Sequence, residues 1–306
     1  MKSNVSRSLR SMGAGHLIRK IFRRLADPGL VAKDVRRLVI DLRTDLIRLY
    51  AAYHQQRKTP GRVFRIRRRD CRMWLPISYG DTVAQRRFGT FEPWTFDTLD
   101  RIVRPGFVVI ELGACYGAFT IHLSRLVGPT GRVYGFEPFP KYFKIAERNV
   151  ALNALANVRL LNQAVAPPSM TSVDFNAESI SPYSGVQQIT GFDYPGASEG
   201  IKSGNDHSRE TVRCVSLLEF LHNEQCAMDL LFMDIEGCEI EVLKNIRSLL
   251  CDGPKRPVVF FELHPYFYRS GDEASLNGFF EECGYATERI SSHLLCTPQP
   301  QPQPQP

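Results

Sequence analysis

The segment that most constrains this chain is the run F-V-V-I-E-L-G-A-C-Y-G at residues 107–117, which a second apolar run follows. Val108–Ile110 is continuously apolar, as in a strand that a parallel sheet buries on both faces. Gly113 and Gly117 permit a sharp turn and the close approach of a ligand. Glu137 ends the second run, at a strand tip where a carboxylate can accept hydrogen bonds from both ribose hydroxyls. The pattern predicts a β-α-β unit that binds a nucleoside.

The spacing of the glycines indicates which nucleoside is bound. A dinucleotide fingerprint reads G-x-G-x-x-G, whereas this chain reads G-x-x-x-G with Cys115 in the place of the central glycine. Glu111 lies two residues before the first glycine. A carboxylate there repels a phosphate but attracts a cationic amine or sulfonium. We therefore predict S-adenosylmethionine (SAM), and not NAD, as the cofactor.

Further motifs in the segment Phe91–Leu294 resemble the FkbM-type methyltransferase family. Five of them follow the family's order, namely Glu111-Leu-Gly-Ala-Cys-Tyr-Gly117, Phe136-Glu-Pro138, Asn149 with Asn153, Asp234-Ile-Glu-Gly-Cys-Glu239 and Glu262-Leu-His264. The resemblance implies O-methylation of a hydroxyl on a sugar, glycan or secondary metabolite. Three positions depart from the family pattern: Glu111 replaces Asp, Cys115 replaces Asn, and Met233 stands where a lysine is usual.

The resemblance also implies which residues surround the cofactor. The loop after the third strand is expected to contact adenine through Asn162, Gln163 and Ala164, and Glu92 matches an acidic position that the family often carries near the cofactor. The predicted cofactor-binding residues are Glu92, Glu111, Gly113, Ala114, Tyr116, Gly117, Glu137, Pro138, Gln163, Ala164 and Asp234.

Methyl transfer to oxygen needs a nucleophile held in line and a group that takes its proton. Asp234 and His264 follow two predicted neighbouring strands, so His264 is the candidate general base and Asp234 orients substrate or cofactor. Their structural alternatives are a loop histidine bonded to backbone and a cap of the following turn. Glu236 completes the catalytic prediction, and Glu239 is a further candidate for a hydroxyl-binding pocket. No spacing dictates a metal site, although Glu262, Asp234 and Glu236 together have the oxygen ligands that Mg²⁺ prefers.

Strands that alternate with helices predict an α/β protein. With the family resemblance, residues 91–296 are expected to form a Rossmann-like class I methyltransferase fold, a mostly parallel seven-stranded sheet with helices on both faces. The third strand is expected over Val158–Val165 and one amphipathic helix over Glu239–Leu250. Asn176–Arg209 is rich in Ser, Gly, Asp and Pro, which favours a substrate-covering loop over simple disorder. Residues 297–306 are expected to be a disordered Pro-Gln tail.

Charge divides the chain. Residues 1–90, expected to be a mainly helical extension, contain 22 Lys and Arg residues and 6 Asp and Glu residues, so this part is basic. Residues 91–306 contain 17 Lys and Arg residues and 26 Asp and Glu residues, so this part is acidic. The extension either packs on the acidic domain or binds an anionic membrane surface through residues 17–69. Nucleic acid is the least favoured partner. The extension lacks a regular aromatic platform, and the chain has D-I-E-G where base-methylating enzymes usually carry N/D-P-P-Y/F.

The eight cysteines include no C-x-x-C pair, which argues against a zinc site and favours reduced thiols. No apolar stretch reaches the length of a membrane span, and the N-terminus has no signal-peptide hydrophobic region. These features predict a cytoplasmic protein, with the inner face of the membrane as the site of any peripheral attachment.

Overall fold

The structure, a computed structural model, describes residues 62–66, 71–75, 92–176, 209–235, 237–265, 268 and 272–300. The chain divides into two compact units, Met1–Phe91 and Glu92–Pro306. In the first unit, strands β1 (Arg62–Ile66) and β2 (Cys71–Leu75) pair antiparallel, and the helical expectation did not include this strand pair. The predicted N-terminal helices, the interior of the predicted loop (177–208) and Glu236 lie outside the described residues.

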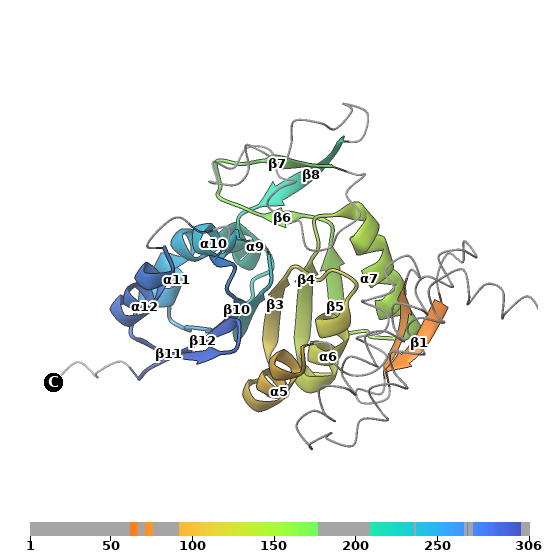
Figure 1. Cartoon of the computed structure of the whole chain (residues 1–306), viewed down its shortest axis with the longest axis horizontal. Coiled ribbons are helices and arrows are strands. Elements are labelled where there is room, and N and C mark those ends of the chain that lie inside the picture. The colour runs from red at the N-terminus through yellow and green to blue at the C-terminus, as the bar shows by residue number, and fades with distance from the viewer. Residues whose placement is uncertain are drawn as a thin grey trace, which may run out of the picture. The chain divides into compact units, whose positions relative to one another are not determined.

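The second unit contains a seven-stranded sheet with the order β11-β12-β10-β9-β3-β4-β5 (Figure 1). Only β12 runs antiparallel to its neighbours, β10 and β11. The chain order reverses between β3 and β9, and ligands of open α/β sheets bind at such a switch point. This topology confirms the predicted Rossmann-like class I fold. The strands are β3 (Val108–Leu112), β4 (Arg132–Phe136), β5 (Val158–Leu161), β9 (Leu230–Met233), β10 (Val258–Glu262), β11 (Tyr285–Ile290) and β12 (His293–Pro298).

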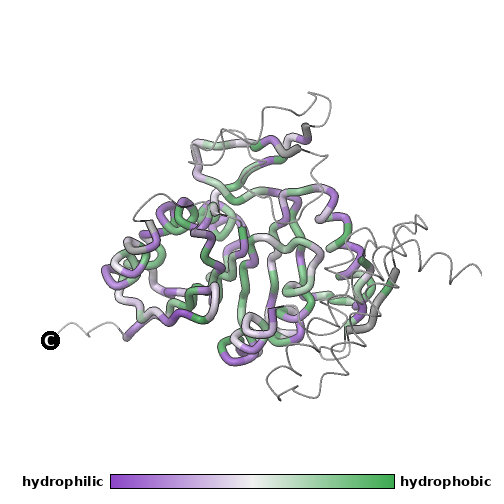
Figure 2. The backbone as a smooth tube through the Cα atoms, viewed as in Figure 1, coloured by the Kyte–Doolittle hydropathy of each residue, from purple (hydrophilic) through white to green (hydrophobic). Residues whose placement is uncertain are grey.

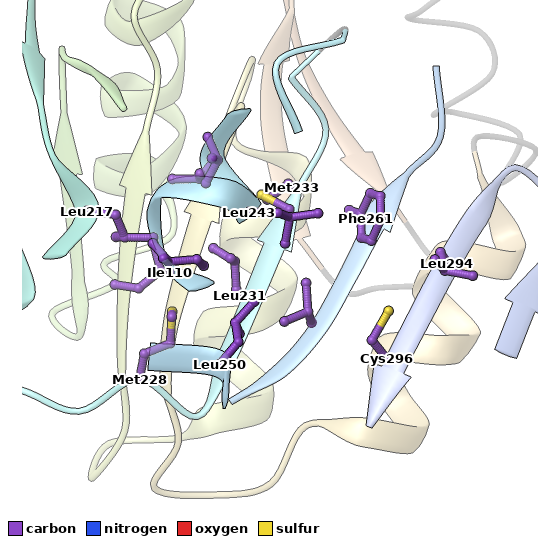
Figure 3. Close-up of a cluster of buried hydrophobic side chains, with 14 of the residues drawn as sticks. Ile110, Leu217, Met228, Leu231, Met233, Leu243, Leu250, Phe261, Leu294 and Cys296 are labelled. Carbon is purple, nitrogen blue, oxygen red and sulfur yellow. The ribbon is translucent and has the colours of Figure 1, made fainter. Parts of the chain in front are cut away.

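Helices cover both faces of this sheet. On one face, Phe119 of α6 lies between Phe96 of α5 and Phe232 of β9, with ring centroids 4.7 and 5.1 Å away. On the other face, Ile110 and Phe261 belong to a buried hydrophobic cluster with side chains of the later helices (Figure 3). The helices are α5 (Pro93–Ile102), α6 (Ala118–Val127) and α7 (Pro140–Leu152), then α9 (Leu217–Asn223), α10 (Glu239–Asn245), α11 (Arg247–Asp252) and α12 (Asp272–Glu282).

The hydropathy pattern explains why these segments take these forms. All four residues of β9 are buried, as in a strand that is covered on both faces. Helix α7 instead alternates between hydrophilic and hydrophobic residues (Figure 2), so it buries one stripe that includes Tyr142, Ile145 and Ala146.

The predicted third strand, Val158–Val165, was wrong in extent. The central sheet keeps only β5, because the chain turns away at Asn162, whose amide donates to the carbonyls of Glu137 and Pro138. Ala164–Val165 is a separate strand, β6, in a second sheet with the order β6-β8-β7. The other two strands of that sheet are β7 (Ser172–Asn176) and β8 (Arg209–Val215). The predicted loop is therefore held at both ends by this sheet.

Three smaller expectations also differ from the structure. The helix expected over Glu239–Leu250 is two helices, α10 and α11, which meet at Ile246. The Pro-Gln tail begins later than expected, because β12 continues to Pro298 and Gln299 N–H donates to the Gly284 carbonyl (2.9 Å).

The third concerns the cysteines. Cys251 and Cys283 form a disulfide between α11 and the end of α12, so the expectation of eight reduced thiols was wrong for this pair. None of the helices in the described ranges combines the length and apolar character that a membrane span requires.

Candidate active site

The glycine loop connects β3 to α6 at the carboxyl edge of the sheet. The N–H groups of Gly113 and Ala114 both donate to the Phe136 carbonyl (2.9 Å), which ties the loop to the end of β4. Gly113 has φ +89°, and a Cβ there would lie 2.0 Å from the carbonyl oxygen of Asp234. Only glycine fits this contact, so the loop and the end of β9 meet directly. The structure thereby brings Asp234 next to the predicted cofactor loop.

Glu137 follows β4, and its carboxylate is fixed by backbone donors. Cys115 N–H donates to Oε2 (2.7 Å) and Phe139 N–H to Oε1 (2.9 Å). Burial raises the pKa of Glu137 to about 7, and these two hydrogen bonds partly offset the rise. Asn162 donates its side-chain amide to the Glu137 and Pro138 carbonyls (2.9 and 2.8 Å), and its predicted contact with adenine stays a prediction. A ribose diol would meet a carboxylate whose position is already set.

Glu111 is fully buried below the glycine loop. Its Oε2 accepts a hydrogen bond from Thr120 of α6 (2.6 Å), while Oε1 has no hydrogen-bond partner among the described residues. Burial raises its pKa to about 8; the Thr120 bond opposes this rise and the nearby Glu137 charge adds to it. Burial thus favours the protonated form of Glu111, and a cation placed nearby would favour its ionised form. Its predicted contact with the cofactor's amine stays a prediction.

Asn149 anchors the glycine loop, a role that the sequence did not indicate. It is fully buried, and its amide donates to the Tyr116 carbonyl (2.8 Å). The Tyr116 ring is itself buried against Tyr142, at 5.0 Å between centroids. Of the predicted adenine-side residues, Ala164 is buried in β6 and Gln163 is half-buried.

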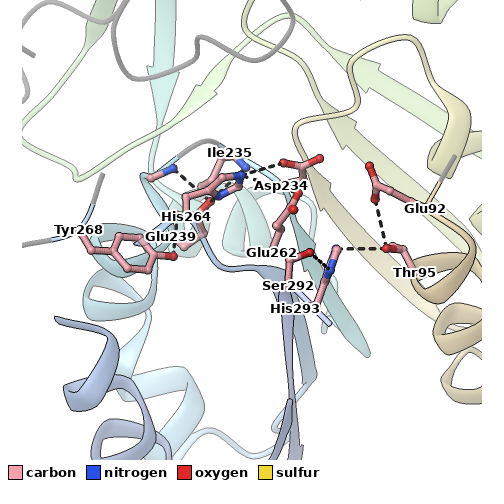
Figure 4. A network of polar contacts seen from close by, with 11 residues as sticks. Glu92, Thr95, Asp234, Ile235, Glu239, Glu262, His264, Tyr268, Ser292 and His293 are labelled. Carbon is pink, nitrogen blue, oxygen red and sulfur yellow. Dashed lines mark hydrogen bonds and ion pairs between the residues drawn. The ribbon is translucent and has the colours of Figure 1, made fainter. Parts of the chain in front are cut away.

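A polar cluster lies beyond the ends of β9 and β10 (Figure 4). Asp234 directly follows β9, Glu262 ends β10 and His264 lies two residues later. His264 Nε2 is 3.7 Å from both Asp234 Oδ1 and Glu262 Oε2. The three side chains are 12 to 26% exposed, so a ligand can reach them. The structure thus brings together Asp234 and His264, as the strand positions predicted.

Glu239 does not take the predicted place in a hydroxyl-binding pocket, because its side chain is fully buried. Its Oε1 lies 2.9 Å from His264 Nδ1 and also accepts from Ile235 and Gly237 N–H (3.3 Å each), and Tyr268 donates its hydroxyl to Oε2 (3.2 Å). Such a carboxylate fixes the orientation of the imidazole ring, so Glu239 is a positioning residue. The E-G-x-E spacing placed it near the site but gave no sign of its burial.

A second group lies beside Glu262. His293, which begins β12, is paired with Glu262 in the sheet and lies 3.2 Å from Thr95 Oγ1. Thr95 donates to Glu92 Oε2 (3.1 Å), and burial lowers the pKa of His293 to about 4. The structure therefore places Glu92 in this second group, next to the polar cluster, and its predicted cofactor contact stays a prediction. No sequence motif marked Thr95 or His293.

Comparison with known proteins decides the family. The family described as "Methyltransferase FkbM domain" matches residues 111–287. The match covers more than half of the chain and contains all five motifs. The chain belongs to the FkbM methyltransferase family. It is thus a SAM-dependent methyltransferase, as the glycine spacing and the resemblance predicted.

Two sequence relatives differ, by their names, in the atom that they methylate. The chain is 24% identical over 172 residues to a probable cobalt-precorrin-6B C(15)-methyltransferase (decarboxylating) of Saccharolobus solfataricus, covering 56% of this chain and 81% of the relative. It is 32% identical over 87 residues to a protein-L-isoaspartate O-methyltransferase of Methanothrix thermoacetophila, covering 28% of this chain and 39% of that protein.

Among solved structures, a precorrin-6y C5,15-methyltransferase from Geobacter metallireducens gives a TM-score of 0.37 at 15% identity, covering 65% of this chain and 83% of that one. A fibrillarin from Aeropyrum pernix with natively bound SAM gives a TM-score of 0.37 at 15% identity, covering 64% of this chain and 67% of the fibrillarin chain. The two sequence relatives, by name a C-methyltransferase and an O-methyltransferase, leave open which kind of atom receives the methyl group here.

The described residues fit the cofactor. Two buried acids at the ends of adjacent strands suit a ligand that carries a ribose diol and positive charge. Oε1 of Glu111, which no described residue contacts by a hydrogen bond, can accept one from such a ligand. Bound SAM supplies an electrophilic methyl group. The chain's part is to hold Glu137 and the glycine loop in place and to present the polar cluster beside them.

Proposed function

We propose that this protein O-methylates a hydroxyl of a polyhydroxylated acceptor such as a sugar, glycan or secondary metabolite. The observation that carries the proposal is the position of the polar cluster. Asp234, Glu262 and His264 lie together at the carboxyl edge of the sheet, and the Asp234 backbone touches the glycine loop. An acceptor at this cluster lies next to the cofactor loop.

Removal of the hydroxyl proton is the chemistry that the cluster supports. Glu239 holds His264 through Nδ1, which leaves Nε2 on the side of Asp234 and Glu262. We propose that the acceptor hydroxyl loses its proton at this position, with His264 as the group nearest to receive it. Asp234 and Glu262 are acceptors for neighbouring hydroxyls, which suits an acceptor that carries several of them.

The acceptor can be found by transfer in extracts. Extracts from cells that lack the gene, incubated with the purified protein and methyl-labelled SAM, should gain a labelled product whose mass exceeds that of its precursor by one methyl group. His264→Ala should lower the rate of labelling by about 10²–10⁴-fold and leave SAM affinity nearly unchanged. The matched control is His222→Ala, because His222 is an exposed histidine on α9.

Label on a carbon or nitrogen atom of the product, or full activity of His264→Ala, would contradict the proposal. The alternative is a nucleic-acid acceptor, because the basic N-terminal segment carries the charge that would attract one. Label recovered in RNA or DNA would favour this alternative.

A further inference from the structure

The polar cluster brings three possible ligand atoms together at distances longer than a hydrogen bond. The candidate ligand atoms of Asp234, Glu262 and His264 all lie within 4.8 Å of one another, and Nε2 is 3.7 Å from each of two carboxylate oxygens. A separation of 3.7 Å is too long for a hydrogen bond. Ligand atoms about 2.0–2.3 Å from a shared cation lie roughly 3–4.5 Å apart, so the spacing matches that of a cation's ligands.

The contacts of Glu239 decide which nitrogen of His264 faces the cluster without a proton. The buried carboxylate already accepts two backbone N–H groups and the Tyr268 hydroxyl, and it lies 2.9 Å from Nδ1. In a neutral ring the proton is therefore on Nδ1, and the Nε2 lone pair points toward two carboxylates. A cation among these three electron-pair donors would offset their mutual repulsion.

The same arrangement occurs in metal sites generally. A metal-binding histidine almost always donates its second ring N–H to a carboxylate or carbonyl, which fixes the tautomer and raises the basicity of the ligand nitrogen. Here Glu239 has that place, and its full burial keeps the contact free of competing water. Glu92, whose carboxylate lies in a second group with Glu262 and His293, adds further negative charge nearby.

We propose that Asp234, Glu262 and His264 bind a divalent cation that in turn binds the acceptor's hydroxyl oxygen. One imidazole and two carboxylates suit Mn²⁺ better than Mg²⁺, which prefers oxygen ligands alone. Three protein ligands leave positions for the acceptor and for water.

This inference rests on the proposed function and refines the role of His264. Its Nε2 lone pair is used as a ligand, and the bound hydroxyl becomes more acidic because the cation stabilises the alkoxide. The O–H bond breaks, the proton passes to water, and the oxygen keeps the electron pair with which it forms a bond to the methyl carbon. The bond from that carbon to the sulfonium sulfur breaks, and its electron pair stays on the sulfur of the departing, demethylated cofactor.

Mn²⁺ binding to the full-length protein tests the proposal directly. After treatment with a chelator and its removal, the protein is titrated with Mn²⁺, and free Mn²⁺ is measured by its electron paramagnetic resonance signal. We expect one tight site per chain, a loss of at least about tenfold in affinity in Asp234→Asn, Glu262→Gln or His264→Gln, and about 10–100-fold weaker binding in Glu239→Gln.

Matched controls are His222→Gln on α9 and Glu241→Gln on α10, both away from the cluster; they should bind Mn²⁺ as the unaltered protein does. SAM binding, measured on the same samples, reports whether each variant is folded.

The outcomes separate the two proposals. If SAM binds but Mn²⁺ does not, or if His264→Gln binds Mn²⁺ unchanged, the cation site is wrong and a doubly protonated His264 is the remaining account. If the cation binds as expected but the labelled methyl group never reaches an oxygen atom, the proposed O-methylation fails and the cation site stands.

Discussion

At the scale of single residues, the site depends on buried acids whose protonation differs from that of exposed ones. Glu111 and Glu137 lie at the ends of adjacent strands, and burial raises both pKa values, to about 8 and about 7. The sequence predicted these two acids because their positions relative to Gly113 and the second apolar run follow from strand geometry. It did not predict the Thr120 contact, since nothing in the spacing indicates which helix residue faces Glu111.

The raised pKa of Glu111 makes stability depend on pH. Between the ordinary value of 4.5 and about 8, the folded state holds a proton that the unfolded state has lost, so the free energy of unfolding falls as pH rises through this range. Glu111→Gln should flatten this part of the curve, most visibly between pH 6 and 8, in urea unfolding at a series of pH values. Glu241→Gln, which changes a partly exposed acid, is the control; equal slopes in Glu111→Gln and the unaltered protein would contradict the account.

Cys115 carries a backbone conformation that its residue type disfavours. Its φ of +49° lies in the left-handed region, which asparagine adopts more readily than cysteine, and asparagine is the residue that the family pattern has there. Cys115→Asn should therefore raise the free energy of unfolding, by no more than the roughly 1–2 kcal/mol that the left-handed conformation costs an ordinary residue, and should preserve the N–H bond to Glu137. A loss of stability in urea unfolding would count against this reading; Cys226→Asn, at a half-buried cysteine outside the loop, is a comparison.

At the scale of elements, the glycine loop is held from three sides, by β4, α7 and the end of β9. Sequence reasoning located the loop, α6 and the strands, because their apolar periods and glycines are local signals. It extended the third strand too far, since Asn162 breaks the strand by binding carbonyls of a different loop, which is a tertiary contact. The division of α10 from α11 at Ile246 likewise has no local glycine or proline to mark it.

The anchor from α7 gives a prediction at this scale. Asn149→Ala removes the donor to the buried Tyr116 carbonyl and should cost about 1–3 kcal/mol of stability, with weaker SAM binding because the loop is less well held. Asn245→Ala removes a similar amide-to-carbonyl bond within α10 and should leave SAM affinity unchanged. Thermal unfolding and SAM titration of both variants check this. Equal SAM affinities would show that Asn149 does not position the loop.

At the scale of the whole molecule, the strand order determines which side chains meet. The reversal of chain order between β3 and β9 brings Glu137, Asp234 and His264 to one edge of the sheet although they are far apart in sequence. The topology could be predicted from the alternation of elements together with the family resemblance. The pairing of β1 with β2 and the sheet formed by β6, β7 and β8 were not predicted. Strand β7 (S-V-D-F-N) does alternate polar and apolar residues, and β2 (C-R-M-W-L) does so in part, but a five-residue alternation does not show which segment the strand pairs with.

The charge division of the chain also belongs to this scale. If the basic segment binds an anionic membrane surface, the full-length protein should sediment with vesicles that contain anionic lipid, and less so as salt rises, since each Lys or Arg near the surface contributes about 1 kcal/mol through a screened potential. A truncated chain beginning at Thr90 should still bind SAM but should no longer sediment with the vesicles. If the full-length protein does not bind such vesicles at low salt and the truncated protein aggregates, the results would favour the alternative that the basic segment packs on the acidic domain.

The central claim, that the glycine loop and Glu137 form a SAM site, is tested most directly by calorimetric titration of the full-length protein. We predict that SAM and its demethylated product bind, that NADH does not, and that Glu137→Ala weakens SAM binding by about 1–3 kcal/mol through the loss of hydrogen bonds to the ribose. Glu288→Ala, at an exposed acid on β11, should bind SAM as the unaltered protein does. Binding of NADH in place of SAM, or unchanged SAM affinity in a folded Glu137→Ala protein, would contradict the account.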